Sequence, residues 1–437
     1  MEKDPNKDVG TVRLREPDRT QIEMVIQSPD ELVPQDHPVR MIWRICQSQD
    51  LSAFCEPIKA REGVCGRDST SPTLLVALWL YAYTRGIGSA REIARLCTES
   101  KPYMWLCGKV SMNHHTLSDF RVNHAEALDA LFTRMIAMLV EKKLVKVYRI
   151  SQDGTRVRAC AGASSFRREE RLEQQLEEAR KHVEELRKLL DDPEKSAGLS
   201  AKQKAVRTRA ARQREQRIEQ AIERLPELKK KQEKLAKRKS KKEKLRLKEP
   251  RVSTTDAEAT VMKMANGGFN PAVNVQFATD TQSRAIVGVE VSGEGNDHHL
   301  SEPMRQQVQE RTGQKVHEHL IDGGYLVMEE IERGAEQRVD VYVPPKPPRN
   351  KEQAGSQYQP KPGESTALGD WRQRMGSEEG REIYKERAAT SETVNGDLRT
   401  HRGMERMRVR GLKKAKCVAL WCAMAYNIMH FGAALIT

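Results

Sequence analysis

The chain has 437 residues and a mass of 49.8 kDa, which suits two or three domains and excludes a single small module. Charged residues make up 32% and apolar residues 38% of the chain, too polar for a protein with several membrane spans and too rich in core-forming residues for full disorder. The net charge of +14 favours a polyanionic partner such as nucleic acid.

Most of the positive charge is concentrated in one segment. Residues 201–250 contain 20 Lys and Arg against 7 Asp and Glu, whereas residues 167–200 contain 8 against 10. The rest of the chain is only mildly basic, so the overall charge does not locate a DNA-binding surface there.

The 8 cysteines include no Cys-x-x-Cys pair, which argues against a zinc ribbon or finger. The start of the chain (MEKDPNKDVG) has no secretory signal. We therefore expect a reduced, cytoplasmic location, next to the nucleoid if the partner is DNA.

Residues 1–37 read as a polar leader, and residues 38–143 have a helical pattern. Polar residues before Pro72 and Ser89 are typical of helix starts, and Gly86 and Gly88 separate these two helices. Further helices are predicted from Thr116 and over 125–142. The pattern indicates a compact helical domain, and such domains commonly enter DNA grooves.

Residues 144–164 change to a strand pattern, because apolar and polar residues alternate from Leu144. Asp153-Gly154 is interpreted as a turn, with a return strand over 155–160. This segment is predicted to be the first part of an α/β core.

Residues 165–249 are predicted to be an insertion. Apolar residues from Leu172 to Leu190 recur at steps of 4 and 3, and a second series runs from Ile218 to Leu235. A turn over 191–200 would join the two, giving an antiparallel coiled-coil hairpin with Pro226 kinking the second arm. Its basic end would be a solvated arm, or a contact to DNA phosphates or to a second protomer.

Residues 250–437 are predicted to complete the core. Strands are expected over 272–278, 285–291, 317–321 and 339–343, and helices over 300–311, 326–333 and about 378–436. Residues 417–437 are long and apolar enough to cross a bilayer. A buried terminal helix is the preferred interpretation and a membrane anchor the alternative.

Three acids could form a reactive site. Asp153 and Asp322 interrupt or end apolar strands and are each followed by glycine, and Glu392 lies on a helical stretch. Three carboxylates that meet repel one another unless a dication lies between them, and oxygen ligands favour Mg²⁺ or Mn²⁺. Two such ions suit phosphodiester chemistry. Each Asp-Gly pair, taken alone, is more often a turn.

Several motifs together carry a resemblance to a family. They are GRDSTSPTLLVALWLYAYTRGIGSAREIARLC and HHTLSDFR at the front, and ISQDGTRV, TTDAEATVMK, NPAVNVQFATD, GNDHHL, HLIDGGY and YKERAATSE in the core. From about residue 23 to its end, the chain resembles the DDE transposases of bacterial insertion sequences. The resemblance implies a helical N-terminal DNA-binding domain and an RNase H-like catalytic core, interrupted here by the hairpin.

The resemblance also implies site residues. Asp153, Asp322 and Glu392 would be the catalytic, metal-binding triad with two Mg²⁺ ions. Tyr384, Arg387 and Arg399 would hold DNA phosphates or orient the helix that carries Glu392; Arg399 stands where the family typically has Lys. Arg91 and Arg121 could touch DNA or form surface salt bridges.

Asp256, Asp280 and Asp297 fall in family-like motifs, and each has a structural alternative: capping the region after the insertion, a hairpin turn, and a loop or helix cap.

The expected function is Mg²⁺-dependent cleavage of double-stranded DNA at transposon ends and joining of the freed 3′-OH to target DNA. Because two ends must meet, a homodimer or larger synaptic assembly is expected, without a membrane partner. The alternative is a catalytically inactive, transposase-derived DNA-binding protein. A coiled-coil scaffold is a third class.

Overall fold

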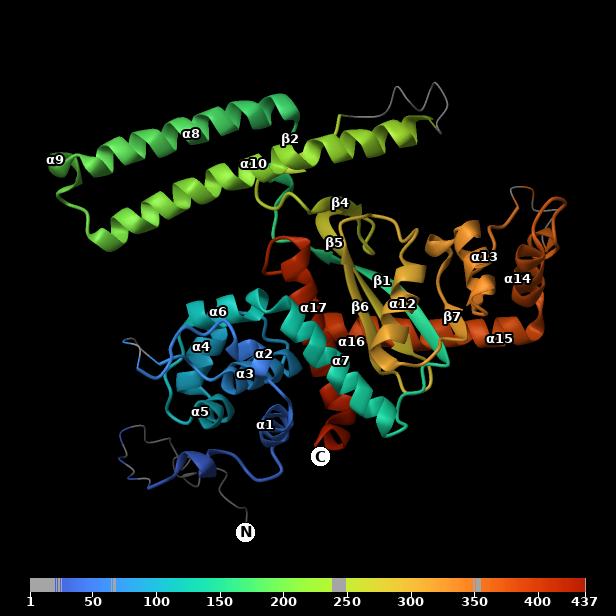
Figure 1. Ribbon diagram of the computed structural model, residues 1–437, viewed down its shortest axis with the longest axis horizontal. Helices are drawn as coiled ribbons and strands as arrows, with labels where there is room; N and C mark the ends of the chain where they lie inside the picture. Colours follow the sequence, from blue (N-terminus) through green and yellow to red (C-terminus); the bar gives the residue numbers. More distant parts are fainter. Residues whose placement is uncertain are drawn as a thin grey trace, which may run out of the picture.

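The computed structural model in Figure 1 describes residues 20, 22, 24, 26–63, 65, 68–237, 249–348, 350 and 355–436. It contains a bundle of helices from the front of the chain, a sheet flanked by helices, and a long pair of helices that projects from the sheet. Most of the predicted polar leader and the basic stretch 238–248 lie outside the described residues.

The front of the chain is helical, as predicted. Its elements are η1 (Pro29–Leu32), α1 (Pro38–Ser48), α2 (Ser52–Cys55), α3 (Pro72–Thr84), α4 (Ala90–Glu99), α5 (Lys101–Cys107), α6 (His114–Asn123) and α7 (Ala125–Glu141). The Ser89 hydroxyl caps α4 by accepting a hydrogen bond from the Glu92 amide at 3.4 Å. Helix α3 is buried almost all round, which makes it the centre of this bundle.

One mixed sheet forms the core. Its strands are β1 (Arg149–Arg158), β4 (Thr260–Lys263), β5 (Phe269–Asp280), β6 (Ile286–Ser292), β7 (Glu318–Leu320) and β8 (Asp340–Tyr342). The order is β4-β5-β1-β7-β8, and β6 pairs with the edge of β5 that faces away from β1. Strand β5 runs antiparallel to β1, whereas β7 and β8 run parallel to it.

The predicted turn at Asp153-Gly154 is wrong. Strand β1 continues through both residues, with Asp153 opposite Phe277 and Gly154 opposite Gln276 on β5. Nine consecutive residues of β1 pair with β5, so the backbone gains more from the continuous ladder than from a turn at the Asp-Gly pair.

Helices cover the sheet and continue to the end of the chain. They are α12 (Ser301–Thr312), η3 (Gly323–Tyr325), α13 (Met328–Glu336), η5 (Ser356–Tyr358), α14 (Thr366–Gly376), α15 (Glu378–Arg387), α16 (Thr393–His401), α17 (Leu412–Phe431) and η7 (Gly432–Leu435). A π-helical turn, η6 (Ala388–Glu392), joins α15 to α16, so residues 378–401 form one helix with a widened turn inside it.

Helix α17 joins the front bundle to the sheet. It packs against α3, α6 and α7 on one side and β6 on the other (Figure 1). The Asn427 side chain accepts a hydrogen bond from the Ile286 amide at 3.0 Å and donates one to the Ile286 carbonyl at 2.8 Å. The segment Leu412–Leu435 is long and apolar enough to span a membrane, but 72% of its most apolar stretch is buried inside the molecule, as expected for a core helix.

The insertion forms two long helices, α8 (Glu169–Asp191) and α10 (Ala201–Lys237), joined at the short helix α9 (Pro193–Ser196). The two helices lie side by side and antiparallel (Figure 1). Arg180 of α8 contacts Glu219 of α10 at 2.8 Å, and Glu169 at the start of α8 contacts Lys229 near the end of α10 at 2.5 Å. Leu172, Ala179, Ile218, Ala221 and Leu225 form the buried seam between them. A helical hairpin is therefore present, and Pro226 lies inside α10 without ending it.

Candidate carboxylate site

Asp153 lies in the middle of β1 with its side chain 20% exposed. Its carboxylate accepts hydrogen bonds from the Gly154 amide at 3.0 Å and from the Asn395 side-chain amide, on α16, at 3.2 Å. Burial raises the pKa of Asp153 to about 6. The positive charge of Arg387 opposes this rise, and the negative charges of Asp322 and Asp297 reinforce it.

Asp322 follows the neighbouring strand. Ser151 on β1 is opposite Leu320 on the parallel strand β7, so Asp153 and Asp322 each stand two residues beyond the same pair. Asp322 caps the 3-10 turn η3, and its carboxylate accepts a hydrogen bond from the Gly324 amide at 2.6 Å. The parallel register therefore brings these two predicted site residues to one place on the sheet.

Asp297 belongs to the same cluster. It lies in the loop between β6 and α12, and its carboxylate accepts hydrogen bonds from the side-chain amides of Asn274 at 2.6 Å and Gln276 at 2.8 Å, both on β5. A Cβ built on Gly154 would lie 2.7 Å from the Asp297 carboxylate, and one built on Gly324 would lie 3.3 Å from it. Asp297 therefore sits between the glycines that follow Asp153 and Asp322.

A buried tyrosine lies behind the three aspartates. The Tyr325 hydroxyl donates a hydrogen bond to the Gln276 side-chain carbonyl. Burial raises the pKa of Tyr325 well above its ordinary value, and the negative charges of Asp297, Asp153 and Asp322 raise it further. All three carboxylates are thus close enough to act on one phenol.

Glu392 enters from the π-helical turn η6, which packs against β1 and β5. The hydroxyl of the buried Ser391 hydrogen-bonds the hydroxyl of Ser151 on β1, which anchors the turn, while the Glu392 side chain is 66% exposed. A π turn changes the direction of the following side chains relative to the preceding helix and is common at functional sites.

Arg387 links the two sides of the site. Its guanidinium lies 3.9 Å from the Asp153 carboxylate and 3.6 Å from the Glu392 carboxylate. It also lies over the Tyr384 ring, 5.8 Å from the ring centroid. Burial raises the pKa of Tyr384, Arg387 opposes the rise, and the charges of Asp322 and Asp153 add to it. Tyr384 and Arg387 are therefore part of the carboxylate site.

The donor set fits a divalent cation, although within the described ranges no three acidic, His or Cys side chains are arranged to hold one as they stand. The acids are hard oxygen donors. Burial is the main cause of the raised pKa of Asp153, and the negative charges of Asp322 and Asp297 add to it. The Arg387 guanidinium lies between the carboxylates of Asp153 and Glu392.

The other predicted site residues lie elsewhere. Arg399 is exposed on α16 and lines a cavity of about 640 Å³ between α16 and the end of α3, and Arg91 is exposed at the start of α4 in a neighbouring cavity. Arg121 is only 5% exposed: its guanidinium donates to the Gly88 carbonyl at 2.6 Å and lies 4.9 Å from the Trp79 ring centroid. Packing and hydrogen bonding hold most of the Arg121 side chain inside the bundle, and Arg121 also lines the cavity that contains Arg91.

Asp256 and Asp280 lie outside the carboxylate site. Asp280 accepts hydrogen bonds from the amide and hydroxyl of Ser283, which is the hairpin turn given as its alternative. Asp256 accepts from the Gly411 amide at 3.2 Å, just before α17.

Sequence reasoning did not single out Gln276 and Asn395 and found no role for Asn274. For Asn274 and Gln276, the available signal was that polar residues occupy positions 274 and 276 inside an otherwise apolar strand.

Two family models match the chain. Residues 27–123 match a transposase domain (DUF772), and residues 249–428 match a transposase DDE domain. No curated protein and no solved structure matches the chain. Asp322 and Glu392 lie inside the second match, whereas Asp153 lies before it, on β1, which the insertion separates in sequence from the other strands of the sheet. One match lies on the helical bundle and the other on the sheet, and together they support the assignment of the chain as a DDE transposase.

Proposed function

We propose that the carboxylate site cuts DNA at the ends of a transposon and joins the freed 3′-OH to target DNA, with Asp153, Asp322 and Glu392 as the metal-binding triad and Asp297 as a further acid. The observation that carries this proposal is the convergence of acids from β1, the end of β7 and the loop before α12, with Glu392 facing them through Arg387. Such a cluster is unfavourable without a cation.

Two Mg²⁺ ions, or Mn²⁺ in their place, would activate the attacking oxygen and stabilise the leaving oxygen when bound between these carboxylates. The chain's own residues prepare this site. Asn274 and Gln276 fix the direction of the Asp297 carboxylate, and Asn395 fixes that of Asp153. Because Arg387 contacts both Asp153 and Glu392, it would turn toward a DNA phosphate when the acids take up a cation.

The reaction consists of two phosphoryl transfers. Water attacks the phosphodiester at the transposon end, the P–O bond to the leaving 3′ oxygen breaks, and a 3′-OH remains. That hydroxyl then attacks a phosphodiester of the target, so one P–O bond forms and one breaks in each step. The strand arrangement around Asp153 and Asp322 supports an RNase H-like core for this chemistry, and a cytoplasmic, nucleoid-associated dimer or larger synaptic assembly would carry it out.

The experiment is Mg²⁺-dependent nicking of a duplex that carries a transposon end. Asp153→Asn, Asp322→Asn and Glu392→Gln should each reduce the nicking rate by at least about 100-fold, because each removes a charged ligand. The matched controls are Asp370→Asn and Glu336→Gln, exposed helical acids outside the carboxylate site, which should nick as wild type does.

DNA binding should survive in all five variants. Wild-type nicking by any triad variant would overturn the site assignment. Binding without any nicking by the wild-type protein would instead favour the inactive DNA-binding protein.

A further inference from the structure

The segment between α16 and α17 presents three arginines on one face. Arg406, Arg408 and Arg410 are exposed, whereas the intervening Met407 and Val409 are 2% and 9% exposed. The segment begins beside β1, because Arg406 bridges Arg158 and the Met407 amide donates to the Arg158 carbonyl at 2.8 Å. The three exposed arginines alternate with the two buried residues. These three residues are called the arginine strip below.

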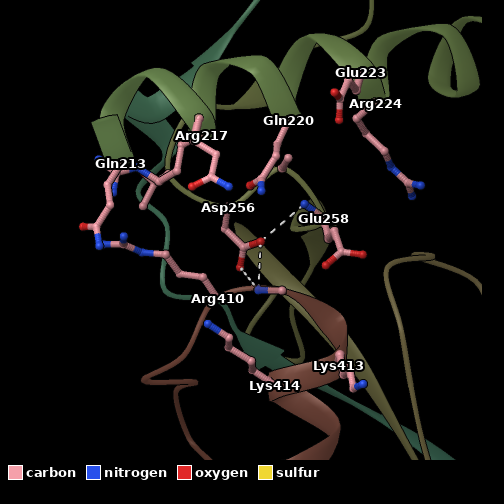
Figure 2. Close-up of a pocket in the computed structure, with 14 residues that line it drawn as sticks. Gln213, Arg217, Gln220, Glu223, Arg224, Asp256, Glu258, Arg410, Lys413 and Lys414 are labelled. Carbon is pink, nitrogen blue, oxygen red and sulfur yellow. Dashed lines mark hydrogen bonds between the residues drawn. The ribbon is translucent and has the colours of Figure 1, made fainter. Parts of the chain in front are cut away.

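The arginine strip connects three cavities. Arg406 and Arg408 line both the cavity of about 640 Å³ that contains Arg399 and the cavity of about 480 Å³ that contains Arg91. Arg410 lines a third, of about 640 Å³, beneath α10. Figure 2 shows α10 on one side of this third cavity and Arg410, Lys413 and Lys414 on the other, with Asp256 and Glu258 between them.

The carboxylates beside Arg410 are already engaged. The Asp256 carboxylate accepts a hydrogen bond from the Gly411 amide (Figure 2). The Glu258 carboxylate accepts one from the Leu412 amide at 2.9 Å, so both are directed at the start of α17. Across the described residues, Arg406, Arg408 and Arg410 form no side-chain hydrogen bond and no ion pair within 4.0 Å. The segment therefore presents three guanidinium groups without an ion-pair partner within 4.0 Å among the described residues, although the charge of Arg410 acts on the Asp256 carboxylate.

Across the third cavity, Arg217 on α10 adds to the positive charge. Burial lowers the pKa of Arg217, and the charges of Arg410 and Arg214 lower it further. A bound anion would relieve this repulsion. Basic side chains from the front bundle, the arginine strip and α10 line these three cavities, although acids such as Glu405 and Glu223 line them too. Basic groups spread over that length suit a long polyanion better than a single small anion.

We propose that the arginine strip binds the phosphate backbone of duplex DNA along a path from the front bundle, past Arg408, to the underside of α10. The proposal rests on the proposed function, since it places the DNA that the carboxylate site would cut. It also gives the insertion a part in holding DNA. Arginine suits this role because its planar group forms paired hydrogen bonds to phosphate oxygens.

The test is the salt dependence of binding of a transposon-end duplex, measured by fluorescence anisotropy between 50 and 200 mM salt, on the order of physiological ionic strength. Each lost phosphate contact lowers the slope of log K against log salt by roughly 0.9. The triple variant Arg406→Gln, Arg408→Gln and Arg410→Gln should therefore lose about 2–3 units of slope, and Arg408→Gln alone about 1 unit. The same positions changed to Lys should keep most of the slope.

The matched control removes three charges elsewhere. Lys142, Lys146 and Lys315 are exposed and line none of the three cavities, so their combined change to Gln should leave the slope as in wild type. Thermal unfolding checks that each variant folds. If the triple variant does not fold, the slope of the single variant Arg408→Gln decides the test. The proposal would be overturned if Arg408→Gln and the folded triple variant both kept the wild-type slope. It would also be overturned if the control variant lost as much slope as the triple variant.

The two proposals fail in different ways. If the Asp153→Asn protein still nicks DNA, the assignment of the carboxylate site is wrong. The arginine-strip proposal still holds in that case if the salt slope of this variant equals that of wild type. If the triple variant keeps the full salt slope, the arginine-strip proposal is wrong. Loss of nicking in Asp153→Asn would still support the carboxylate site in that case.

Discussion

At the scale of single residues, the environment of Asp153 is unfavourable for an unaccompanied carboxylate. Its pKa is raised from 3.8 to about 6, so the folded protein holds the proton of Asp153 more tightly than the unfolded chain does. Asp153 therefore causes no loss of stability below pH 3.8, an increasing loss as the pH rises to about 6, and a constant loss above that value. The free energy involved is about 1–3 kcal/mol.

The direction of this pH dependence of stability gives a prediction that can be tested without a nicking assay. In EDTA at pH 8, Asp153→Asn should be more stable than wild type by about 1–3 kcal/mol, and the difference should vanish near pH 4. Added Mg²⁺ should stabilise the wild type and leave Asp153→Asn unchanged, because ligand binding to the folded state raises its stability. Urea unfolding at several pH values measures both effects. A variant less stable than wild type at pH 8, or equally stabilised by Mg²⁺, would contradict this account.

The residue scale also shows what the sequence could not reveal about Asp153. The Asp-Gly pair indicates a turn by local preference alone, but Gly154 is needed here for a different reason. A side chain at this position would collide with the Gln276 side-chain amide and with the Asn274 and Asp297 side chains. Those neighbours come from β5 and a later loop, so no local window of sequence contains the cause.

At the scale of elements, the helix containing Glu392 depends on its π turn. One extra residue in the turn rotates everything beyond it by about 100° relative to an α-helix. Deleting the exposed Ala389 should restore α-helical spacing and shift Glu392 away from Arg387 or Ser391 away from Ser151. We expect nicking to fall by at least about 100-fold while the helix content by circular dichroism is retained.

The control for this deletion is Ala389→Ser, which keeps the length of the turn and should nick within about threefold of wild type. Full activity in the deletion variant would show that the π turn has no role in placing Glu392. If the deletion variant instead loses its helical circular-dichroism signal, the turn is needed for folding, through its packing on β1 and β5.

The elements differ in how far sequence alone predicts them. Helices α3 and α4 begin where the sequence indicated, because Pro72 and the Ser89 cap are local signals. Strands β5 and β6 also lie where the apolar runs indicated. The π turn leaves no such local mark in AATSE, where the small polar residues Thr390 and Ser391 are buried. The proposed triad was inferred through resemblance, and the approach of Asp153 to Asp322 required the parallel register of β1 and β7.

At the scale of the whole molecule, the chain carries a long insertion between two strands of one sheet without separating them. The short strands β2 (Phe166–Arg167) and β3 (Val252–Ser253) pair at the base of the hairpin, and the Ser165 and Ser253 hydroxyls are hydrogen-bonded at 2.7 Å. This closure returns the chain to the sheet where it left, so β1 and β5 pair as if they were consecutive. The outer part of the hairpin is therefore separable from the carboxylate site.

This separation allows the outer hairpin to be removed while its base is kept. Replacing residues 184–214 by a short Gly-Ser turn retains the buried seam at Leu172, Ala179 and Leu225 and the contact between Arg180 and Glu219. The shortened protein should nick a transposon end at a rate within a few-fold of wild type, because the acids and their partners are untouched. It should no longer self-associate in sedimentation velocity if the outer hairpin joins protomers.

Two further outcomes separate the roles of the hairpin. An unchanged association state with a reduced salt slope would assign the outer hairpin to DNA, because residues 184–214 include Arg207, Arg209, Arg212 and Arg214. Arg217 and Arg410 remain in the shortened protein, so the arginine strip should still bind DNA in it. Loss of nicking in a shortened protein that folds would contradict the separation itself, since it would mean that the carboxylate site needs the hairpin beyond its closed base.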